Sequence, residues 1–91
     1  GLGALEAIKA AGLTPGKDIK IITIDAVKDG MTALSKGEFN FIVECNPLLG
    51  PQLMDLAKKV VNGDSGPQRV ITKETTFTQE SAAKALPTRQ Y

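Results

Sequence analysis

The stretch Ile19-Lys-Ile-Ile-Thr-Ile-Asp25 is an apolar, β-branched run that stops at a carboxylate. Such a run is typical of a parallel strand that is covered on both faces. A second run, Phe39-Asn-Phe-Ile-Val-Glu44, follows an amphipathic segment over residues 28–36 that Gly37 closes. A helix that connects two neighbouring strands requires parallel pairing and a right-handed crossover. The centre of the chain therefore predicts an α/β fold with a doubly wound parallel sheet.

Helices are expected on both sides of this unit. Residues 1–11 carry apolar side chains at helical spacing, and Gly12 suits the left-handed position after a helix end. No capping residue precedes the first turn, so we expect that the chain was cut upstream. On the other side, Asn46-Pro47 predicts the start of a helix that runs to about Asn62. Its expected inner stripe consists of Leu49, Leu53, Leu56, Ala57 and Val60.

The C-terminal part has a different character. Residues 64–67 predict a loop, and Arg69-Val-Ile-Thr72 predicts a short strand. The Thr-rich residues 73–78 are expected to be extended, and residues 79–86 to form one or two helical turns before Pro87. The last four residues, Thr88–Tyr91, are expected to be a free terminus.

The composition excludes several classes of function. Lys and Arg number 11 against 10 Asp and Glu, so the net charge of +1 gives no electrostatic reason to expect nucleic-acid binding. The absence of histidine excludes triads built on imidazole and metal sites with His ligands. A single cysteine forms neither an internal disulfide nor a metal cluster. We therefore expect no cofactor, no metal and no catalytic residue.

The best candidate ligand residues follow the two predicted strands, because ligands of open parallel sheets bind beyond the carboxyl ends of the strands. Asp25 follows the first strand, where a carboxylate can accept hydrogen bonds from two neighbouring hydroxyls of a polyol. The alternative is that Asp25 caps the helix that follows it. Position alone leaves these two interpretations evenly balanced.

Three further candidates follow the second strand. Glu44 is expected to face either the ligand crevice or solvent, with a slight preference for the crevice. Asn46 is interpreted more readily as the cap of the next helix than as a ligand residue. Cys45 is expected to be a small, buried or half-buried filler, and no histidine is present to activate its thiol.

Longer stretches resemble a known family. Gly3-Ala-Leu-Glu-Ala-Ile-Lys-Ala-Ala-Gly-Leu-Thr-Pro-Gly-Lys-Asp-Ile-Lys-Ile21, with the strand end Thr-Ile-Asp25-Ala, resembles the C-terminal lobe of bacterial sugar-binding proteins of ABC importers. These are periplasmic binding proteins of the ribose- and galactose-binding type. Lys36-Gly-Glu-Phe-Asn-Phe-Ile-Val-Glu-Cys-Asn-Pro-Leu-Leu-Gly-Pro51 and the ending Ala-Leu-Pro-Thr-Arg-Gln-Tyr91 resemble the subgroup that includes galactofuranose-binding proteins.

The resemblance implies part of a type I periplasmic binding protein, a hinged receptor with two Rossmann-like lobes that closes on one monosaccharide. Asp25 would then bind sugar hydroxyls. Cys45 occupies a position where relatives carry Gln or Asn, so Glu44 or Asn46 would be the polar contact from that strand end. Residues 1–71 would belong to the sugar-binding lobe. Residues 72–91 would form a hinge-return segment and a C-terminal helix that packs on an absent N-terminal lobe.

The same resemblance implies a binding protein rather than an enzyme, which works with a membrane permease. It implies a periplasmic or extracellular bacterial location, free or lipid-anchored, with the signal sequence outside this chain. Exposed strand edges predict a homo-oligomer of the fragment. The alternative function is the effector-binding lobe of a transcriptional repressor, which shares this fold. The Thr14-Pro-Gly-Lys-Asp-Ile19 turn and the Leu86–Tyr91 ending are of the importer type.

Overall fold

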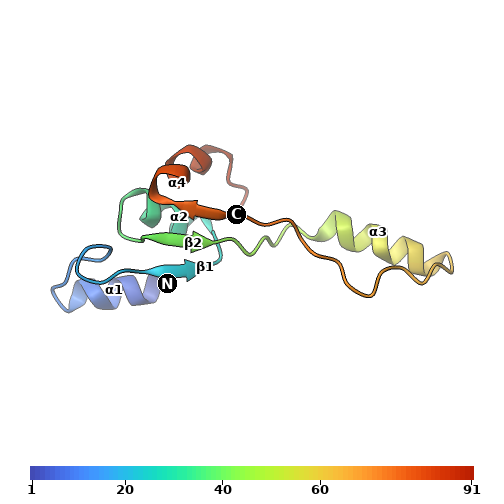
Figure 1. The fold of residues 1–91 in the computed structure, drawn as a ribbon, viewed down its shortest axis with the longest axis horizontal. Coiled ribbons are helices and arrows are strands. Elements are labelled where there is room, and N and C mark those ends of the chain that lie inside the picture. Colours follow the sequence, from blue (N-terminus) through green and yellow to red (C-terminus); the bar gives the residue numbers. More distant parts are fainter.

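A small mixed sheet with helices around it forms the body of the molecule (Figure 1). The computed structural model describes residues 1–91. The predicted helices and the first two strands are present, although most are shorter than expected. In chain order the elements are α1 (Leu2–Ala10), β1 (Ile22–Ile24), α2 (Lys28–Ser35), β2 (Phe41–Val43), α3 (Gly50–Val61), β3 (Thr76–Thr78), α4 (Gln79–Ala85) and a final 3-10 turn, η1 (Leu86–Thr88).

The sheet has three strands in the order β1-β2-β3. The strands β1 and β2 are parallel, as predicted, with Ile22 opposite Phe41. The strand β3 pairs antiparallel with β2, and places Phe77 opposite Ile42. The predicted strand over residues 69–72 is wrong, because that segment has no sheet partner. The expected α/β class is confirmed, and the antiparallel edge makes the sheet mixed.

The core lies between the sheet and the helices α2 and α4, which pack against each other. Its largest fully buried side chains are those of Phe39, Met31, Leu34 and Ile42. Ala82 of α4 is also completely buried, because its small side chain lets α4 approach α2 closely. Residues from Gln79 onward, which were expected to pack on an absent lobe, pack on α2 in this structure. They complete the core of this body.

Two local expectations about the first half of the chain have different outcomes. The helix α1 ends as predicted, since the amide of Leu13 donates to the carbonyl of Ile8 at 3.1 Å around a left-handed Gly12 with φ 75°. The strand β1 is not covered on both faces. Ile22 is 72% exposed and Ile24 is 63% exposed, because β1 is an edge strand and no element of this chain packs over these side chains.

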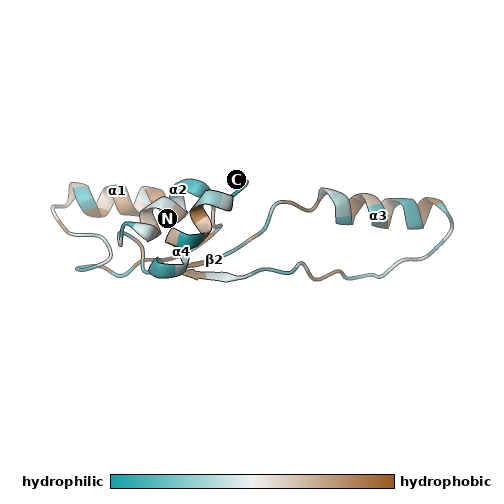
Figure 2. Ribbon diagram, turned by 90° about the horizontal axis from the view of Figure 1, so that it is seen from above, coloured by the Kyte–Doolittle hydropathy of each residue, from teal (hydrophilic) through white to brown (hydrophobic).

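The helix α3 stands apart from the body (Figures 1 and 2). Extended segments 44–49 and 62–75 connect it to the sheet, and the molecule is 59 Å long but only 24 Å and 15 Å across. No residue of α3 is buried, and Leu53 is 63% exposed. The predicted inner stripe is therefore not buried in this chain. The helix begins at Gly50 rather than at Asn46-Pro47, with Pro51 in its first turn.

Candidate functional site

Asp25 lies directly after β1, at the carboxyl edge of the sheet. Its side chain is exposed and lines an open hollow with Gly1, Thr23 and Gly30. The helix-capping interpretation is wrong, because the cap residue of α2 is Val27 and no side chain caps that helix. No hydrogen bond or ion pair within the chain uses the carboxylate of Asp25. Both of its oxygens are available to a ligand.

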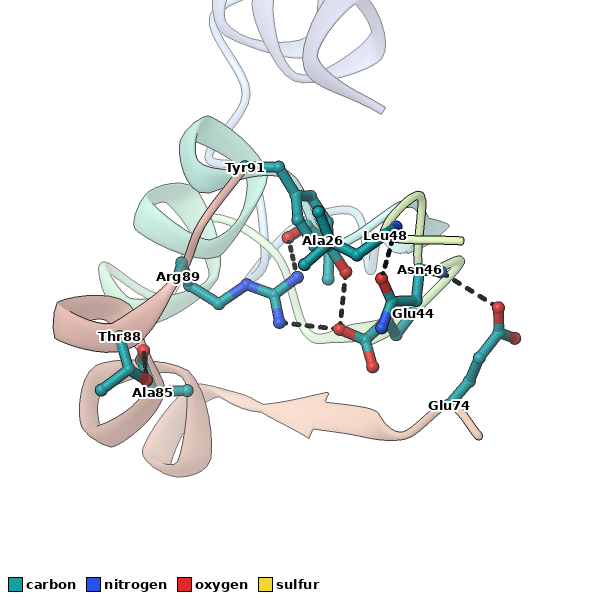
Figure 3. Close-up of polar contacts among 9 residues, drawn as sticks. All are labelled: Ala26, Glu44, Asn46, Leu48, Glu74, Ala85, Thr88, Arg89 and Tyr91. Carbon is teal, nitrogen blue, oxygen red and sulfur yellow. Dashed lines mark hydrogen bonds and ion pairs between the residues drawn. The ribbon is translucent and has the colours of Figure 1, made fainter. Parts of the chain in front are cut away.

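Glu44 follows β2 and is only 7% exposed, so its side chain does not face open solvent, but it lines a hollow together with Asn46, Arg89 and Tyr91. Its Oε1 accepts hydrogen bonds from Arg89 Nη1 and from the hydroxyl of Tyr91, both at 2.7 Å (Figure 3). Arg89 Nη2 donates to the carbonyl of Ala26 at 2.6 Å. The C-terminal residues thereby link the ends of β1 and β2. The expected free terminus over Thr88–Tyr91 is wrong.

Burial and charge act in opposite directions on this cluster of Glu44, Arg89 and Tyr91. Burial raises the pKa of Glu44, but the hydrogen bonds from Arg89 and Tyr91 and the charge of Arg89 outweigh it and hold that pKa below its ordinary value of 4.5. Burial together with the hydrogen bond to Glu44 raises the pKa of Tyr91 above its ordinary value of 10.0. At neutral pH the cluster therefore holds a carboxylate, a guanidinium and a neutral phenol.

The two residues after Glu44 belong to the segment that leaves the sheet toward α3. Cys45 is exposed, because successive side chains of an extended chain point to opposite sides and Glu44 points inward. The expectation of a buried filler is wrong. The side-chain Oδ1 of Asn46 accepts a hydrogen bond from the backbone amide of Leu48 at 2.9 Å (Figure 3). The backbone amide of Asn46 donates to Glu74 Oε1 at 3.0 Å. Asn46 does not cap α3, and its Nδ2 makes no hydrogen bond within the chain.

The structure thus places the four predicted site residues at one edge of the sheet, in different environments. The sequence does not predict Arg89 or Tyr91 as site residues, because both stand out only as part of the ending that resembles the family. The available signal was Glu44 itself, because a carboxylate that ends an apolar strand and is buried requires a cation. The chain has 11 Lys and Arg residues, and nothing in their spacing selects Arg89.

No group of three or more His, Cys, Asp or Glu side chains lies close enough together to hold a metal ion. None of the helices has both the length and the apolar composition that crossing a membrane requires.

Comparison with known proteins finds relatives that are named as sugar-binding proteins. No protein-family model matches the chain. The fructose import binding protein FruE of Bifidobacterium longum is 39% identical over 93 aligned positions, which cover 100% of this chain and 28% of that protein. The galactofuranose-binding protein YtfQ of Escherichia coli is 40% identical over 86 positions, with coverage of 93% and 27%.

Solved structures agree with these relatives. A Mycobacterium smegmatis protein in complex with β-D-fucofuranose is 63% identical and superimposes with a TM-score of 0.93, over 99% of this chain and 30% of that one. The periplasmic binding protein component of an arabinose ABC transporter from Shewanella sp. ANA-3, bound to α- and β-L-arabinofuranose, is 40% identical with a TM-score of 0.85, over 98% and 30%. The chain thus spans less than a third of these relatives.

The predicted resemblance to galactofuranose-binding-like proteins is confirmed by these homologues, which are sugar-binding proteins and include components of ABC importers. The fold matches one part of a type I periplasmic binding protein. The homologues are binding proteins rather than enzymes, and the one from Shewanella is periplasmic.

Proposed function

Since the chain is homologous to about 30% of the length of sugar-binding proteins, we propose that it forms one wall of the sugar cleft in the substrate-binding component of a bacterial ABC importer. A monosaccharide binds there without covalent chemistry and is delivered to a membrane permease. The observation that carries the proposal is the 63% identity and 0.93 TM-score to a protein solved with a bound sugar.

Asp25 is the residue proposed to bind sugar hydroxyls most directly. Its two carboxylate oxygens accept hydrogen bonds, and no group of this chain occupies them. Asn46 offers its Nδ2, and the exposed Cys45 offers its thiol, from the end of β2. Glu44 lines a hollow shared with Asn46, and its Oε1 is held by Arg89 and Tyr91.

The proposed substrate class is a monosaccharide in its furanose form. Relatives have been solved with β-D-fucofuranose and with L-arabinofuranose, and another is a galactofuranose-binding protein. A net charge of +1 fits a neutral ligand that is recognised by hydrogen bonds rather than by charge.

A second lobe is proposed to provide the opposite wall. In place of the expected assignment of residues 1–71 to one lobe, the extended segments 44–49 and 62–75 are proposed to be two crossings between the lobes, with α3 in the second lobe. This assignment is supported by the apolar hollow that Leu49, Leu53, Leu56 and Val70 form on the separated part of the chain. Without cover, this hollow leaves large apolar side chains in water.

We propose a periplasmic or extracellular location, with or without a lipid anchor, no catalytic activity and no nucleic-acid binding. The repressor alternative receives no support from the relatives, whose names describe sugar import and sugar binding. For the 91-residue chain alone we propose a homo-oligomer formed through the open edge of β1, where Ile22 and Ile24 are exposed. Light scattering that finds a stable, well-folded monomer contradicts this last point.

Calorimetry with furanose sugars tests the proposal on the full-length protein that carries this segment. The substitution Asp25→Ala should weaken binding by about 100-fold or more, because it leaves sugar hydroxyls unpaired in a closed cleft. Asp29→Ala, which removes an exposed carboxylate from the first turn of α2, is the matched control and should leave affinity unchanged. Unchanged affinity in Asp25→Ala contradicts the proposed site. The chain alone should bind more weakly than about 1 mM, and micromolar affinity contradicts the single-wall proposal.

A further inference from the structure

The backbone of Asp25 adopts an unusual conformation. It is the only residue other than glycine with a positive φ, at 72°. A side chain with a Cβ is disfavoured in this left-handed region, and Asp is among the few residues that visit it. Such a conformation persists only where the surrounding structure holds it. The contacts around Asp25 therefore determine where its carboxylate points.

Three hydrogen bonds fix the chain at this position. The amide of Asp25 donates to the carbonyl of Val43 at 3.0 Å, and the carbonyl of Asp25 accepts the amide of Val27 at 2.8 Å. The next carbonyl, that of the fully buried Ala26, accepts Arg89 Nη2 at 2.6 Å. The first two bonds are made by neighbouring backbone. The third comes from a side chain 63 residues away in sequence.

Arg89 is itself held firmly. Its Nη1 donates to Glu44, and its guanidinium lies over the ring of Tyr91 at 4.4 Å (Figure 3). The guanidinium also lies 5.1 Å from the centre of the Phe77 ring. The Nε atom of Arg89 is buried without a hydrogen-bond partner. An unpaired buried donor costs free energy, so the orientation of the guanidinium is set by its two Nη contacts at the expense of Nε. Those contacts are with the ends of β1 and β2.

We propose that Arg89 is a positioning residue for sugar binding. By joining the Ala26 carbonyl to Glu44, it holds the left-handed backbone of Asp25 and thus presents the Asp25 carboxylate to the sugar. The inference rests on the proposed role of Asp25 and goes beyond it, because it assigns Arg89 a role that acts through the backbone of Asp25. The planar fork of arginine spans two acceptors, whereas a lysine ammonium at this position reaches only one of them.

The test compares Arg89→Lys with Arg69→Lys, which makes the same change at an exposed position. In the full-length protein, Arg89→Lys should weaken furanose binding about tenfold, and Arg69→Lys should leave it unchanged. Affinity is measured at a temperature where thermal melts show every variant to be folded. A purely structural role lowers the melting temperature and leaves this affinity unchanged, which would overturn the proposal.

A second readout reports on Asp25 directly. The NMR coupling between the amide and α protons of Asp25 depends on φ, and it should change in Arg89→Lys but not in Arg69→Lys. A fall in affinity without a change in this coupling, or a change in coupling without a fall in affinity, contradicts positioning through Asp25. If Arg89→Lys does not fold, Tyr91→Phe removes one hydrogen bond from Glu44 and should show both effects, with an affinity loss of about threefold.

Failure of the proposed function is recognised separately. If Asp25→Ala binds sugar normally, the role of Asp25 is wrong, and the proposal for Arg89 falls with it whatever the coupling shows. If Asp25→Ala loses binding while Arg89→Lys keeps both its affinity and its coupling, the function stands and the positioning role is wrong.

Discussion

The substitution Glu44→Gln tests how much the buried cluster stabilises the fold. Glutamine has nearly the same shape as glutamate and keeps one carbonyl oxygen as an acceptor, but it removes the negative charge. The guanidinium of Arg89, whose side chain is only 10% exposed, then remains in the protein without a counter-ion. An isolated charge in such a place is much more costly than a lost hydrogen bond.

The expected loss follows from the burial of the pair. Removing one member of a buried ion pair costs about 3–5 kcal/mol, and we expect the lower end, about 3 kcal/mol, because the amide still accepts one hydrogen bond. A chain of 91 residues has a free energy of unfolding of roughly 5–14 kcal/mol at typical stability per residue. The single substitution should therefore remove a large part of the total.

The chain contains a matched control for this prediction. Lys84 and Glu80 of α4 also form an ion pair at 2.7 Å, but their side chains are 76% and 82% exposed. Glu80→Gln should cost only about 0.3–0.5 kcal/mol, because solvent screens an exposed helical pair. The two substitutions therefore remove the same charge at the same distance and differ mainly in burial.

Urea denaturation followed by far-ultraviolet circular dichroism measures both losses by linear extrapolation. If Glu44→Gln and Glu80→Gln lower the free energy of unfolding equally, burial of the Glu44–Arg89 pair is not what makes it costly to break. The double substitution Glu44→Leu with Arg89→Met should recover most of the loss, because it leaves no unpaired charge in the interior. Failure to recover would point to lost packing or to the lost hydrogen bonds instead.

Two further predictions concern pH and the backbone of Asp25. The pKa of Glu44 is lowered in the folded state, so on acidification Glu44 is protonated in the unfolded chain at a higher pH than in the folded one. The contribution of Glu44 to the free energy of unfolding should therefore be lost as pH falls from about 4.5 through the folded pKa. The pKa of Tyr91 is raised, so its contribution should be lost as pH rises above about 10.0. Urea titrations from pH 3 to 11 measure both, and an acid decline of the same size in Glu44→Gln would contradict the first. At Asp25, the glycine variant should be more stable than the alanine variant by about 1 kcal/mol, because only glycine adopts φ 72° without strain; equal stabilities would contradict a strained backbone.

Local pattern predicted most of the elements, because periodicity and caps act within a few residues of each position. The helices α1 and α2 and the strands β1 and β2 lie where the apolar spacing placed them, and α4 lies where helical turns were expected before Pro87. The extended conformation of residues 73–78 was predicted, but the pairing of β3 with β2 and the burial of Phe77 were not, because Thr76-Phe77-Thr78 is short and largely polar. Both depend on the open edge of β2, which cannot be deduced from the segment itself.

Burial was harder to predict than secondary structure. The stripe on α3 has the pattern of a buried helix face, yet none of its side chains is buried in this chain, and Leu56 is only half-buried. An amphipathic pattern indicates that a face requires cover, but it does not show which part of a protein supplies that cover. The same limit explains the error at β1, where an apolar run was interpreted as a strand covered on both sides.

Asp25 and Glu44 show most clearly why a site cannot be assigned from position alone. Both are carboxylates that follow an apolar strand, and both ends lie at one edge of the sheet. They differ because Arg89, 45 residues beyond Glu44, donates a hydrogen bond to the Glu44 carboxylate but not to the Asp25 carboxylate. Beside Asp25 it contacts only the backbone carbonyl of Ala26. A carboxylate already paired with a buried cation has little to offer a neutral ligand, whereas an unpaired carboxylate at the surface can accept hydrogen bonds from its hydroxyls. The C-terminal arginine thus decides which of the two carboxylates remains available for binding.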